Sequence, residues 1–597
     1  MNLSLNVVQD LPRVSLRLKP GQQHASKRAD TLSLHTSAKR DLDDASEKQK
    51  HKKQKVEHNN TIRADLHDFK MRMMKNQAER REKPRNKYHN GALRLTRTPG
   101  RHNTANTVSL EDLIDRHFLC SAMVYAFFIE NPYVFDFFPF QKRPNPRPHI
   151  QIYVGRDLSM DADGRKFSGC KKKFPKGDEF NRVVKCAQDG YRDTYGSNFN
   201  AFYPPEMKSG CAHSKLMVLV YPDFLRVVIT SANLMQTDVV LGDNTWYIQD
   251  FPRLAEGIKY EETSFEQDLR IHVEELGCPN NFVDTYMKPG RFDFSAAKVH
   301  LVTSRPGSFS GEEANWYGQL RLRDVVRREI LASYSKDNSP PKMAFEVCVD
   351  SVGHLEKEGV IKQLLKSCAG ALQKSIEGKP ALKMIFPTSS QVTLDMDGSC
   401  NISSHINWSS LKDGHYLKGL FHHYYSKDPG CLFHLKTILA LRADNPKATP
   451  IYMYTGSANF SKGAWGAVMP EKREAVIART LATERVEKIA NYECGVVIRG
   501  EDIAGMLETG KWEDVVPYER PSEANHYRKG ERPWTVPKSA FQPPMDGHGD
   551  SDEDDEDEDG MEDEEESEMK RLAGHPLGIN LVRLLSGAKV HLTGNAR

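Results

Sequence analysis

Apolar residues are spread unevenly along the chain, and their pattern divides it into four parts. The two ends contain few apolar clusters, whereas the long middle alternates short apolar runs with segments of helical period. Residues 149–155 and 343–353 have the length and composition of strands, and 314–332 spaces its apolar residues as a helix does. Strands that alternate with helices predict an α/β fold.

The ends of this regular pattern predict the domain boundaries. We expect a disordered basic arm over residues 1–107, because so polar a segment cannot bury enough apolar surface to offset its chain entropy. A first α/β domain is expected over 108–297 and a second over 298–545. Residues 546–597 form an acidic, low-complexity tail with a candidate short helix.

One short pattern occurs twice in the middle of the chain. The stretch "GCAHSKLMVLVY" places His213 and Lys215 in front of an apolar run, and "FHLKTILALRA" does the same with His434 and Lys436. Successive side chains on a strand point to opposite faces, so the histidine and lysine of each copy share one face. A single copy is usually a basic strand end that reaches solvent.

Each copy runs on into a second apolar strand that ends in the letters S-A-N. The first copy ends with Ser231 and Asn233, and the second with Ser457 and Asn459. The step from histidine to asparagine is 20 residues in the first copy and 25 in the second, and the two histidines are 221 residues apart. Two matched copies indicate a functional site that both halves of the chain build.

These residue types together have the chemistry to cleave a phosphodiester. A neutral imidazole attacks phosphorus near pH 7, and a second histidine protonates the leaving oxygen. Lysine ammonium groups and asparagine amides stabilise the charge on the non-bridging oxygens. Such a reaction passes through a covalent intermediate and is expected to require no cofactor and no metal.

At these positions the sequence resembles the phospholipase D superfamily, whose pattern is H-x-K-x4-D. Val220 and Leu441 stand at the two aspartate positions, and this double loss is typical of the tyrosyl-DNA phosphodiesterase 1 family. The segments "TGSANFSKGAWG", "NYECGVV" and "RPW" agree, and the similarity runs from about Phe118 to Val536. The chain is identified as a fungal-like member of that family.

The resemblance implies two similar α/β/α sandwich domains, related by a pseudo-twofold, that share one site. His213 matches the nucleophile that forms a phosphohistidine with the DNA 3′ end. His434 matches the acid that protonates the departing tyrosyl oxygen and later activates water. The residues that match the family's phosphate clamp are Lys215, Lys436, Asn233 and Asn459.

Four further site residues follow from the resemblance. Glu493, in "NYECG", matches a carboxylate that orients a catalytic histidine in place of the missing motif aspartate. Asn244, eleven residues after the first S-A-N asparagine, is the candidate for a second polar residue of the site. Ser351 matches a DNA-phosphate contact, next to Asp350 where the family commonly has serine, and Ser457 is assigned to substrate binding as well.

The charge distribution bears on localisation. Residues 1–101 hold 24 Lys and Arg against 11 Asp and Glu, whereas residues 550–568 hold 15 acidic residues and no basic one. Lys39–Arg40 and the cluster Lys48–Lys55 fit a bipartite nuclear-import signal, with a generic basic tail as the alternative. We therefore expect a nuclear protein.

The ten cysteines are scattered without a C-x-x-C pair, which favours free thiols and no zinc site.

The sequence thus predicts a metal-independent DNA repair enzyme. Its expected substrates are 3′-phosphotyrosyl bonds, as in stalled topoisomerase I adducts, and other blocked 3′ ends on single-stranded or frayed DNA. We expect a monomer that binds DNA and the topoisomerase I-derived peptide, with no membrane association. The alternatives are another nuclease or lipid phosphodiesterase of the same superfamily and a non-catalytic DNA-end scaffold. The double loss of the motif aspartate argues against the former, and the intact His, Lys and Asn set argues against the latter.

Overall fold

The computed structural model describes most of the chain between residues 84 and 534. The described residues are 84, 86–101, 104–140, 150–158, 177–205, 210–332, 334, 341–353, 358–370, 382–391, 405–406, 419–428, 431–470 and 484–534. The expected import signal at Lys39–Lys55 and the acidic tail lie outside these residues. Within the described ranges, no helix combines the length and apolar character needed to span a membrane.

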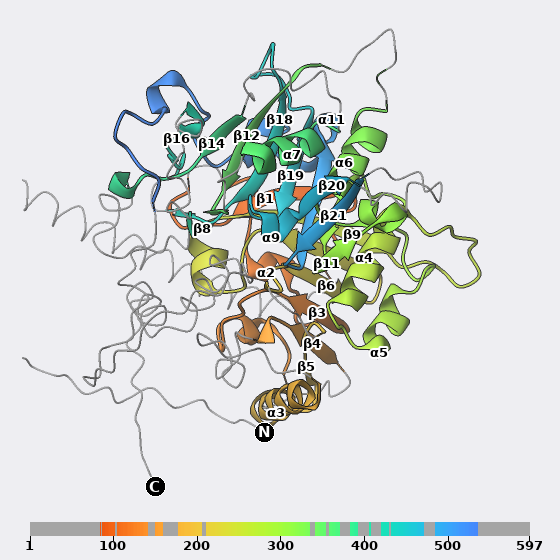
Figure 1. The fold of residues 1–597 in the computed structure, drawn as a ribbon. Helices are drawn as coiled ribbons and strands as arrows, with labels where there is room; N and C mark the ends of the chain where they lie inside the picture. The colour runs from red at the N-terminus through yellow and green to blue at the C-terminus, as the bar shows by residue number, and fades with distance from the viewer. Residues whose placement is uncertain are drawn as a thin grey trace, which may run out of the picture. The chain divides into compact units, whose positions relative to one another are not determined.

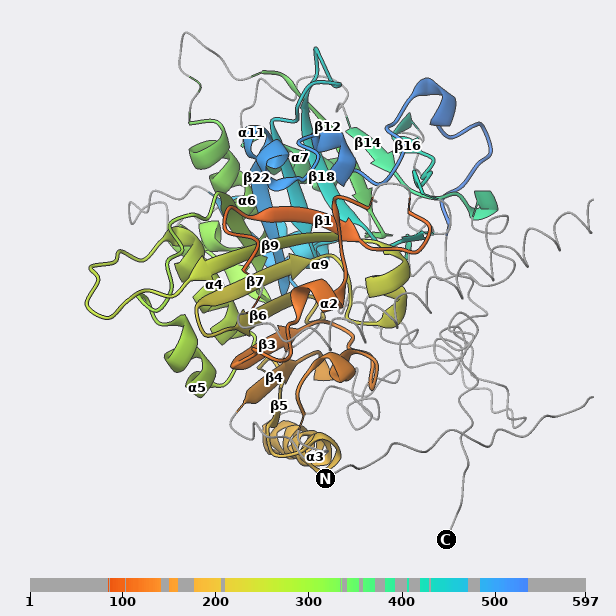
Figure 2. The same cartoon turned by 180° about the vertical axis from the view of Figure 1, so that it is seen from behind.

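The first of two large sheets has eight strands in the order β2-β1-β9-β7-β6-β3-β4-β5 (Figure 1). Its strands are β1 (Ala92–Thr96), β2 (Thr107–Val108), β3 (Ser121–Tyr125), β4 (Gln151–Gly155), β5 (Phe199–Phe202), β6 (Leu216–Val220), β7 (Phe224–Thr230) and β9 (Thr245–Pro252). Helix α3 (Asp178–Tyr195) packs beside β5 at one edge of this sheet (Figures 1 and 2).

The second large sheet has seven strands in the order β10-β22-β19-β18-β12-β14-β16. Its strands are β10 (Val299–Ser304), β12 (Met343–Val349), β14 (Leu382–Ile385), β16 (Phe421–His422), β18 (Lys436–Arg442), β19 (Tyr452–Gly456) and β22 (Glu493–Arg499). Helices α4 (Ser264–Glu275) and α6 (Gly318–Val325) both contact β10, and α7 (Glu358–Cys368) packs on α6.

The smaller elements complete the described fold. Three minor sheets contain β8 (Gly242–Asp243) with β17 (Leu432–Phe433), β13 (Ser351–Val352) with β15 (His405–Ile406), and β11 (Gly307–Phe309) with β21 (Glu484–Ile489) and β20 (Ala467–Pro470). The short α-helices are α2 (Leu110–Leu113), α5 (Asn280–Phe282), α9 (Lys462–Trp465) and α11 (Gly500–Ile503).

The two large sheets repeat one topology. The order β1-β9-β7-β6-β3-β4-β5 corresponds strand by strand to β10-β22-β19-β18-β12-β14-β16. The first four neighbouring pairs are antiparallel and the last two are parallel in both sheets. Each repeated H-x-K therefore stands at the start of the equivalent strand, β6 or β18. The predicted α/β fold with two similar halves is confirmed.

Strand β6 shows why its residues are apolar on both faces. Leu216, Val218 and Val220 join a core that also contains residues of the second sheet, whereas Met217 and Leu219 join a separate core on the other face of the first sheet. A strand that is covered on both faces has an almost continuously apolar sequence. The shared core places the starts of β6 and β18 in one densely packed interior.

The basic arm is shorter than the sequence predicted. Residues 92–96, inside the segment expected to be disordered up to residue 107, form β1, which pairs with β9. Leu93 and Leu95 are buried in the shared core, and the guanidinium of Arg94 donates a 2.7 Å hydrogen bond to the carbonyl of Met506. This short alternating strand has no distinct signal in the sequence because its surroundings are rich in Lys and Arg.

Candidate active site

His213 is oriented by a residue from the other half of the chain. Residue 212, just before His213, forms a β-bridge with Tyr492, and the amide of Tyr492 donates to the carbonyl of Cys211. The same pairing brings the next residue, Glu493, to the imidazole. The Glu493 Oε2 atom lies 3.0 Å from Nδ1 of His213, and both side chains are buried.

Glycine at position 210 permits this close approach of two backbones. Gly210 has a φ of +84°, and a Cβ atom there would lie 2.1 Å from the carbonyl oxygen of Ala490. Any other residue would both strain the backbone and push the two segments apart.

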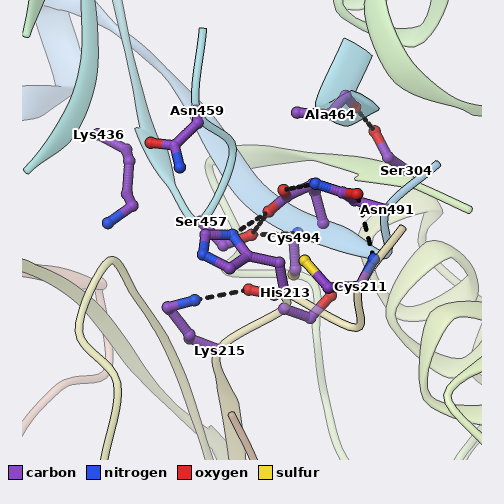
Figure 3. Close-up of polar contacts among 12 residues, drawn as sticks. Cys211, His213, Lys215, Ser304, Lys436, Ser457, Asn459, Ala464, Asn491 and Cys494 are labelled. Atoms are coloured by element: carbon purple, nitrogen blue, oxygen red, sulfur yellow. Dashed lines mark hydrogen bonds and ion pairs between the residues drawn. The ribbon is translucent and has the colours of Figure 1, made fainter. Parts of the chain in front are cut away.

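The Glu493 carboxylate is itself held by two neighbours, Ser457 and Asn491, which are labelled in Figure 3. The Ser457 hydroxyl donates to Oε2 of Glu493 and accepts a 2.9 Å hydrogen bond from the amide of Cys494. The Asn491 amide donates to Oε1 of Glu493 at 3.2 Å. With both oxygens occupied, the carboxylate has one fixed orientation toward His213.

His434 is oriented in the equivalent way by the first half. Strand β17 pairs with β8, and in this pairing Phe433, just before His434, lies opposite Asp243, just before Asn244. The Asn244 Oδ1 atom lies 3.0 Å from Nδ1 of His434. The Ser231 hydroxyl donates to the same Oδ1 at 2.8 Å and accepts from the amide of Thr245 at 3.1 Å.

The two arrangements correspond residue by residue but differ in charge. In the first half, the Ser231 hydroxyl donates to Asn244 and accepts from the next backbone amide. In the second half, the Ser457 hydroxyl does the same with Glu493 and the amide that follows it. In this equivalent position Nδ1 of His213 meets a carboxylate oxygen, whereas Nδ1 of His434 meets a neutral amide oxygen, with the Asp238 carboxylate 3.3 Å away. In both cases Nδ1 is occupied, which leaves Nε2 as the nitrogen available for chemistry.

The two lysines of the motif are fully buried beside their histidines. The Lys215 ammonium donates to the carbonyl of His213 at 2.8 Å, and that of Lys436 lies 3.1 Å from both the carbonyl and Nε2 of His434. A buried ammonium is expensive unless it is paired, so these lysines favour an anion between them.

Burial and the two lysines set the protonation of the site. Burial lowers the pKa of His213, while Glu493 opposes this and Lys215 adds to it. Burial, followed by Lys436 and Lys215, lowers the pKa of His434 well below its ordinary value. Burial, and then Lys436, lowers the pKa of Lys215 to about 7. Burial alone would raise the pKa of Glu493, but His213 and Lys215 keep it below its ordinary value.

The two S-A-N asparagines differ in their surroundings. Asn459 is buried, and its Oδ1 has no hydrogen-bond partner among the described residues. The Asn233 Oδ1 accepts a 3.4 Å hydrogen bond from the amide of Phe128, and its own backbone amide donates to Asp238 at 2.8 Å. Figure 3 shows Asn459 and Lys436 on the same side of His213.

The two serines assigned to substrate have different places in the structure. The Ser457 hydroxyl is engaged by Glu493 and Cys494, so it supports the carboxylate rather than facing a ligand. Ser351 is buried in β13, where it pairs with β15 and its carbonyl accepts from the amide of Phe460 at 3.3 Å.

Three residues of the site were not predicted as site residues. Asp350 and Asp238 flank His434, with carboxylate oxygens 3.4 Å from its Nε2 and 3.3 Å from its Nδ1, respectively. The ring of Phe127, just after β3, lies 5.6 Å from the His213 ring and 5.9 Å from the Lys215 ammonium. Their sequence signals are weak. Each of the three residues lies next to an apolar run, where ordinary turn and core residues also occur.

The arrangement of these histidines and lysines defines a class of protein. It is an α/β protein in which two repeated halves bring two oriented histidines and two buried lysines into one site, a set suited to phosphoryl transfer. In the described part of the chain, no group of three or more His, Cys, Asp or Glu residues is arranged to hold a metal ion.

Comparison with known proteins identifies the family. The profile of the tyrosyl-DNA phosphodiesterase family matches residues 92–560, and the chain therefore belongs to that family. Tyrosyl-DNA phosphodiesterase 1 of Arabidopsis thaliana is 27% identical over 295 residues, which is 45% of each chain. A probable tyrosyl-DNA phosphodiesterase of Caenorhabditis elegans is 26% identical over 303 residues, or 48% of this chain and 62% of that protein.

These matches are partial. The chain spans about half the length of the curated relatives it matches. A crystal structure of yeast tyrosyl-DNA phosphodiesterase is 14% identical and covers 69% of this chain and 91% of that chain, with a TM-score of 0.46. That similarity by itself assigns no role to any residue.

Proposed function

We propose that this protein hydrolyses 3′-phosphotyrosyl bonds in DNA, such as those left by a stalled topoisomerase I, and other blocked 3′ ends. The observation that carries the proposal is the pair of histidines, each oriented at Nδ1 by a residue of the opposite half and each followed by a buried lysine. Both its membership of the family and the names of its relatives support this substrate class.

The first step forms a covalent intermediate. Nε2 of His213 attacks phosphorus and forms a P–N bond while the P–O bond to tyrosine breaks. The phosphate anion beside His434 raises the pKa that burial and the two lysines lower in the free enzyme. In the complex His434 is therefore protonated, and it gives its Nε2 proton to the departing phenolic oxygen. The negative charge of Glu493 at Nδ1 stabilises the positive charge that develops on the His213 ring, as a buried carboxylate does in other histidine-based sites.

The second step releases the DNA. Neutral His434 takes a proton from water as the water oxygen attacks phosphorus, and the P–N bond breaks with its electron pair returning to His213. The products are a 3′-phosphate strand and the starting enzyme. In both steps Lys215, Lys436 and Asn459 are assigned to the non-bridging oxygens, where ammonium and amide donors stabilise the transition state. Proton transfer and charge stabilisation thus come from side chains of this protein.

A single assay separates this proposal from its alternatives. A labelled single strand with a 3′-phosphotyrosyl group is incubated with the protein in EDTA, beside the same strand with a free 3′ hydroxyl. We expect the tyrosyl strand to be converted to the 3′-phosphate strand and the hydroxyl strand to stay intact. Degradation of both strands would indicate a general nuclease, and no reaction with either would indicate a non-catalytic DNA-end protein.

We also propose that the protein acts in the nucleus as a monomer. The support for import is the pair of basic clusters at Lys39–Arg40 and Lys48–Lys55. A fluorescent fusion that lacks residues 1–83, all of which precede the described fold, should lose nuclear accumulation while its turnover of a short tyrosyl strand stays within a few-fold. Nuclear accumulation that persists without these residues would exclude them as the signal.

A further inference from the structure

The reaction above gives no role to Asp350, one of two acidic side chains that flank His434. Asp350 follows β12 and is buried. Its Oδ1 lies 2.9 Å from the Lys436 ammonium, and its Oδ2 lies 3.4 Å from Nε2 of His434. A carboxylate therefore occupies a position between the two groups that the proposed reaction assigns to the substrate phosphate and to proton transfer.

Charge, and not a rigid scaffold, holds this carboxylate in place. Among the described residues, Oδ1 of Asp350 accepts no hydrogen bond beyond its ion contact with Lys436. The other charged groups that interact with it are Lys215, which attracts it, and Asp238, which repels it. A stronger anion that arrives at Lys436 can therefore displace Asp350 without breaking a set of backbone hydrogen bonds.

An anion in this place opposes phosphate binding. A phosphate oxygen bound to Lys436 and to Nε2 of His434 would lie where the Asp350 carboxylate now lies, and two like charges that close repel each other in a poorly solvated site. The repulsion is greater for the product than for the substrate. A 3′-phosphate monoester carries about −1.5 to −2 charge at pH 7, whereas the phosphodiester substrate carries a single negative charge.

We propose that Asp350 is an internal anion that takes the place of the phosphate when DNA is absent and, on returning to Lys436, expels the 3′-phosphate product. This inference rests on the proposed function, since it assigns the product. Asp350 then acts as a specificity-determining residue that weakens binding of the product more than binding of the substrate.

The test compares affinities for strands that differ only at the 3′ end. Asp350→Asn removes the charge with little change of shape, and Asp350→Ser provides a second, smaller side chain. Fluorescence anisotropy gives the Kd of each full-length variant for a single strand with a 3′ phosphate and for the same strand with a 3′ hydroxyl. We expect both variants to bind the 3′-phosphate strand about tenfold more tightly than the unmodified protein does, with unchanged affinity for the hydroxyl strand.

A matched control removes the same charge outside the site. Asp444 is exposed and pairs with Arg442, the last residue of β18. Lys436 is at the other end of that strand. Asp444→Asn should leave both affinities unchanged. In steady-state assays with the tyrosyl strand, the Asp350 variants should show a lower inhibition constant for added 3′-phosphate strand, with a smaller decrease in KM.

Equal or weaker affinity of both Asp350 variants for the 3′-phosphate strand would overturn the proposal, because Asp350 would then be ordering Lys436 for the ligand. The binding measurement requires no cleavage. If the unmodified protein failed to hydrolyse the tyrosyl strand, the proposed function would fall, while the affinities would still decide whether Asp350 competes with phosphate.

Discussion

The carboxylate of Glu493 lies 3.0 Å from Nδ1 of His213, although the two residues are 280 positions apart in the chain. The equivalent contact, between Asn244 and His434, joins residues 190 positions apart at the same distance. Each half of the chain thus supplies one catalytic histidine and also the residue that orients the histidine of the other half. In these two equivalent contacts the carboxylate faces His213, the histidine that is proposed to become positively charged during attack.

Removal of the charge on Glu493 tests this assignment. Glu493→Gln keeps the shape of the side chain but cannot stabilise positive charge on the His213 ring, so kcat should fall by about 10²- to 10⁴-fold. Glu501→Gln is the matched control, because Glu501 is exposed and lies just beyond the other end of β22. The measurement is steady-state turnover of the 3′-phosphotyrosyl strand. Similar activity of the two variants would remove Glu493 from the catalytic group.

The close approach of the two halves at Gly210 should be sensitive to a single methyl group. In Gly210→Ala, the added Cβ would overlap the carbonyl of Ala490, so the free energy of unfolding should fall by about 1–3 kcal/mol. Gly100→Ala provides the control, because Gly100 has a φ of +83° with no atom within 4 Å of the added Cβ. Denaturant unfolding of both variants separates the overlap from the backbone strain they share. Equal losses would show that contact with Ala490 contributes nothing.

The buried ammonium of Lys215 predicts a dependence on pH. Its pKa of about 7, which results from burial and from Lys436, means that the free enzyme loses this positive charge as the pH rises through neutrality. Phosphate binding should weaken accordingly, so kcat/KM should decline above pH 7. In Lys215→Arg the guanidinium stays charged, and the decline attributable to residue 215 should disappear even if the maximum is lower. Titration of His434 is common to both proteins, so identical profiles would contradict the role assigned to Lys215.

The site residues that a sequence can reveal are those within a repeated local pattern. The position before two apolar runs reveals His213, Lys215, His434 and Lys436. In the structure each histidine interacts electrostatically with both lysines, so all four lie in one site. Asn244 depended on resemblance alone, since nothing local in "GDNTWY" distinguishes it from a turn residue; the pairing of β8 with β17 is what sets it on His434.

Contacts between distant segments explain what the sequence did not predict. Asp350 and Asp238 are 112 positions apart in the numbering and meet only around His434, so neither has a local signal of its own. Strand β1 lacks a sequence signal for a related reason. Its pairing with β9, more than 140 residues later, is what orders a segment that by composition belongs to the basic arm.

In the proposed reaction His213 attacks phosphorus and His434 completes the reaction. In His434→Asn, attack by His213 can proceed because a phenol with a pKa of about 10 leaves with little help, whereas water activation is lost, so a covalent protein–DNA species should accumulate. The direct measurement is denaturing electrophoresis of reactions with a labelled 3′-phosphotyrosyl strand, followed by mass spectrometry of the peptide that carries the nucleotide. We expect a slow-migrating species for His434→Asn, with the nucleotide on His213, and no such species for His213→Ala. A trapped species in His213→Ala, or a nucleotide attached to any residue other than His213, would show that His213 is not the nucleophile.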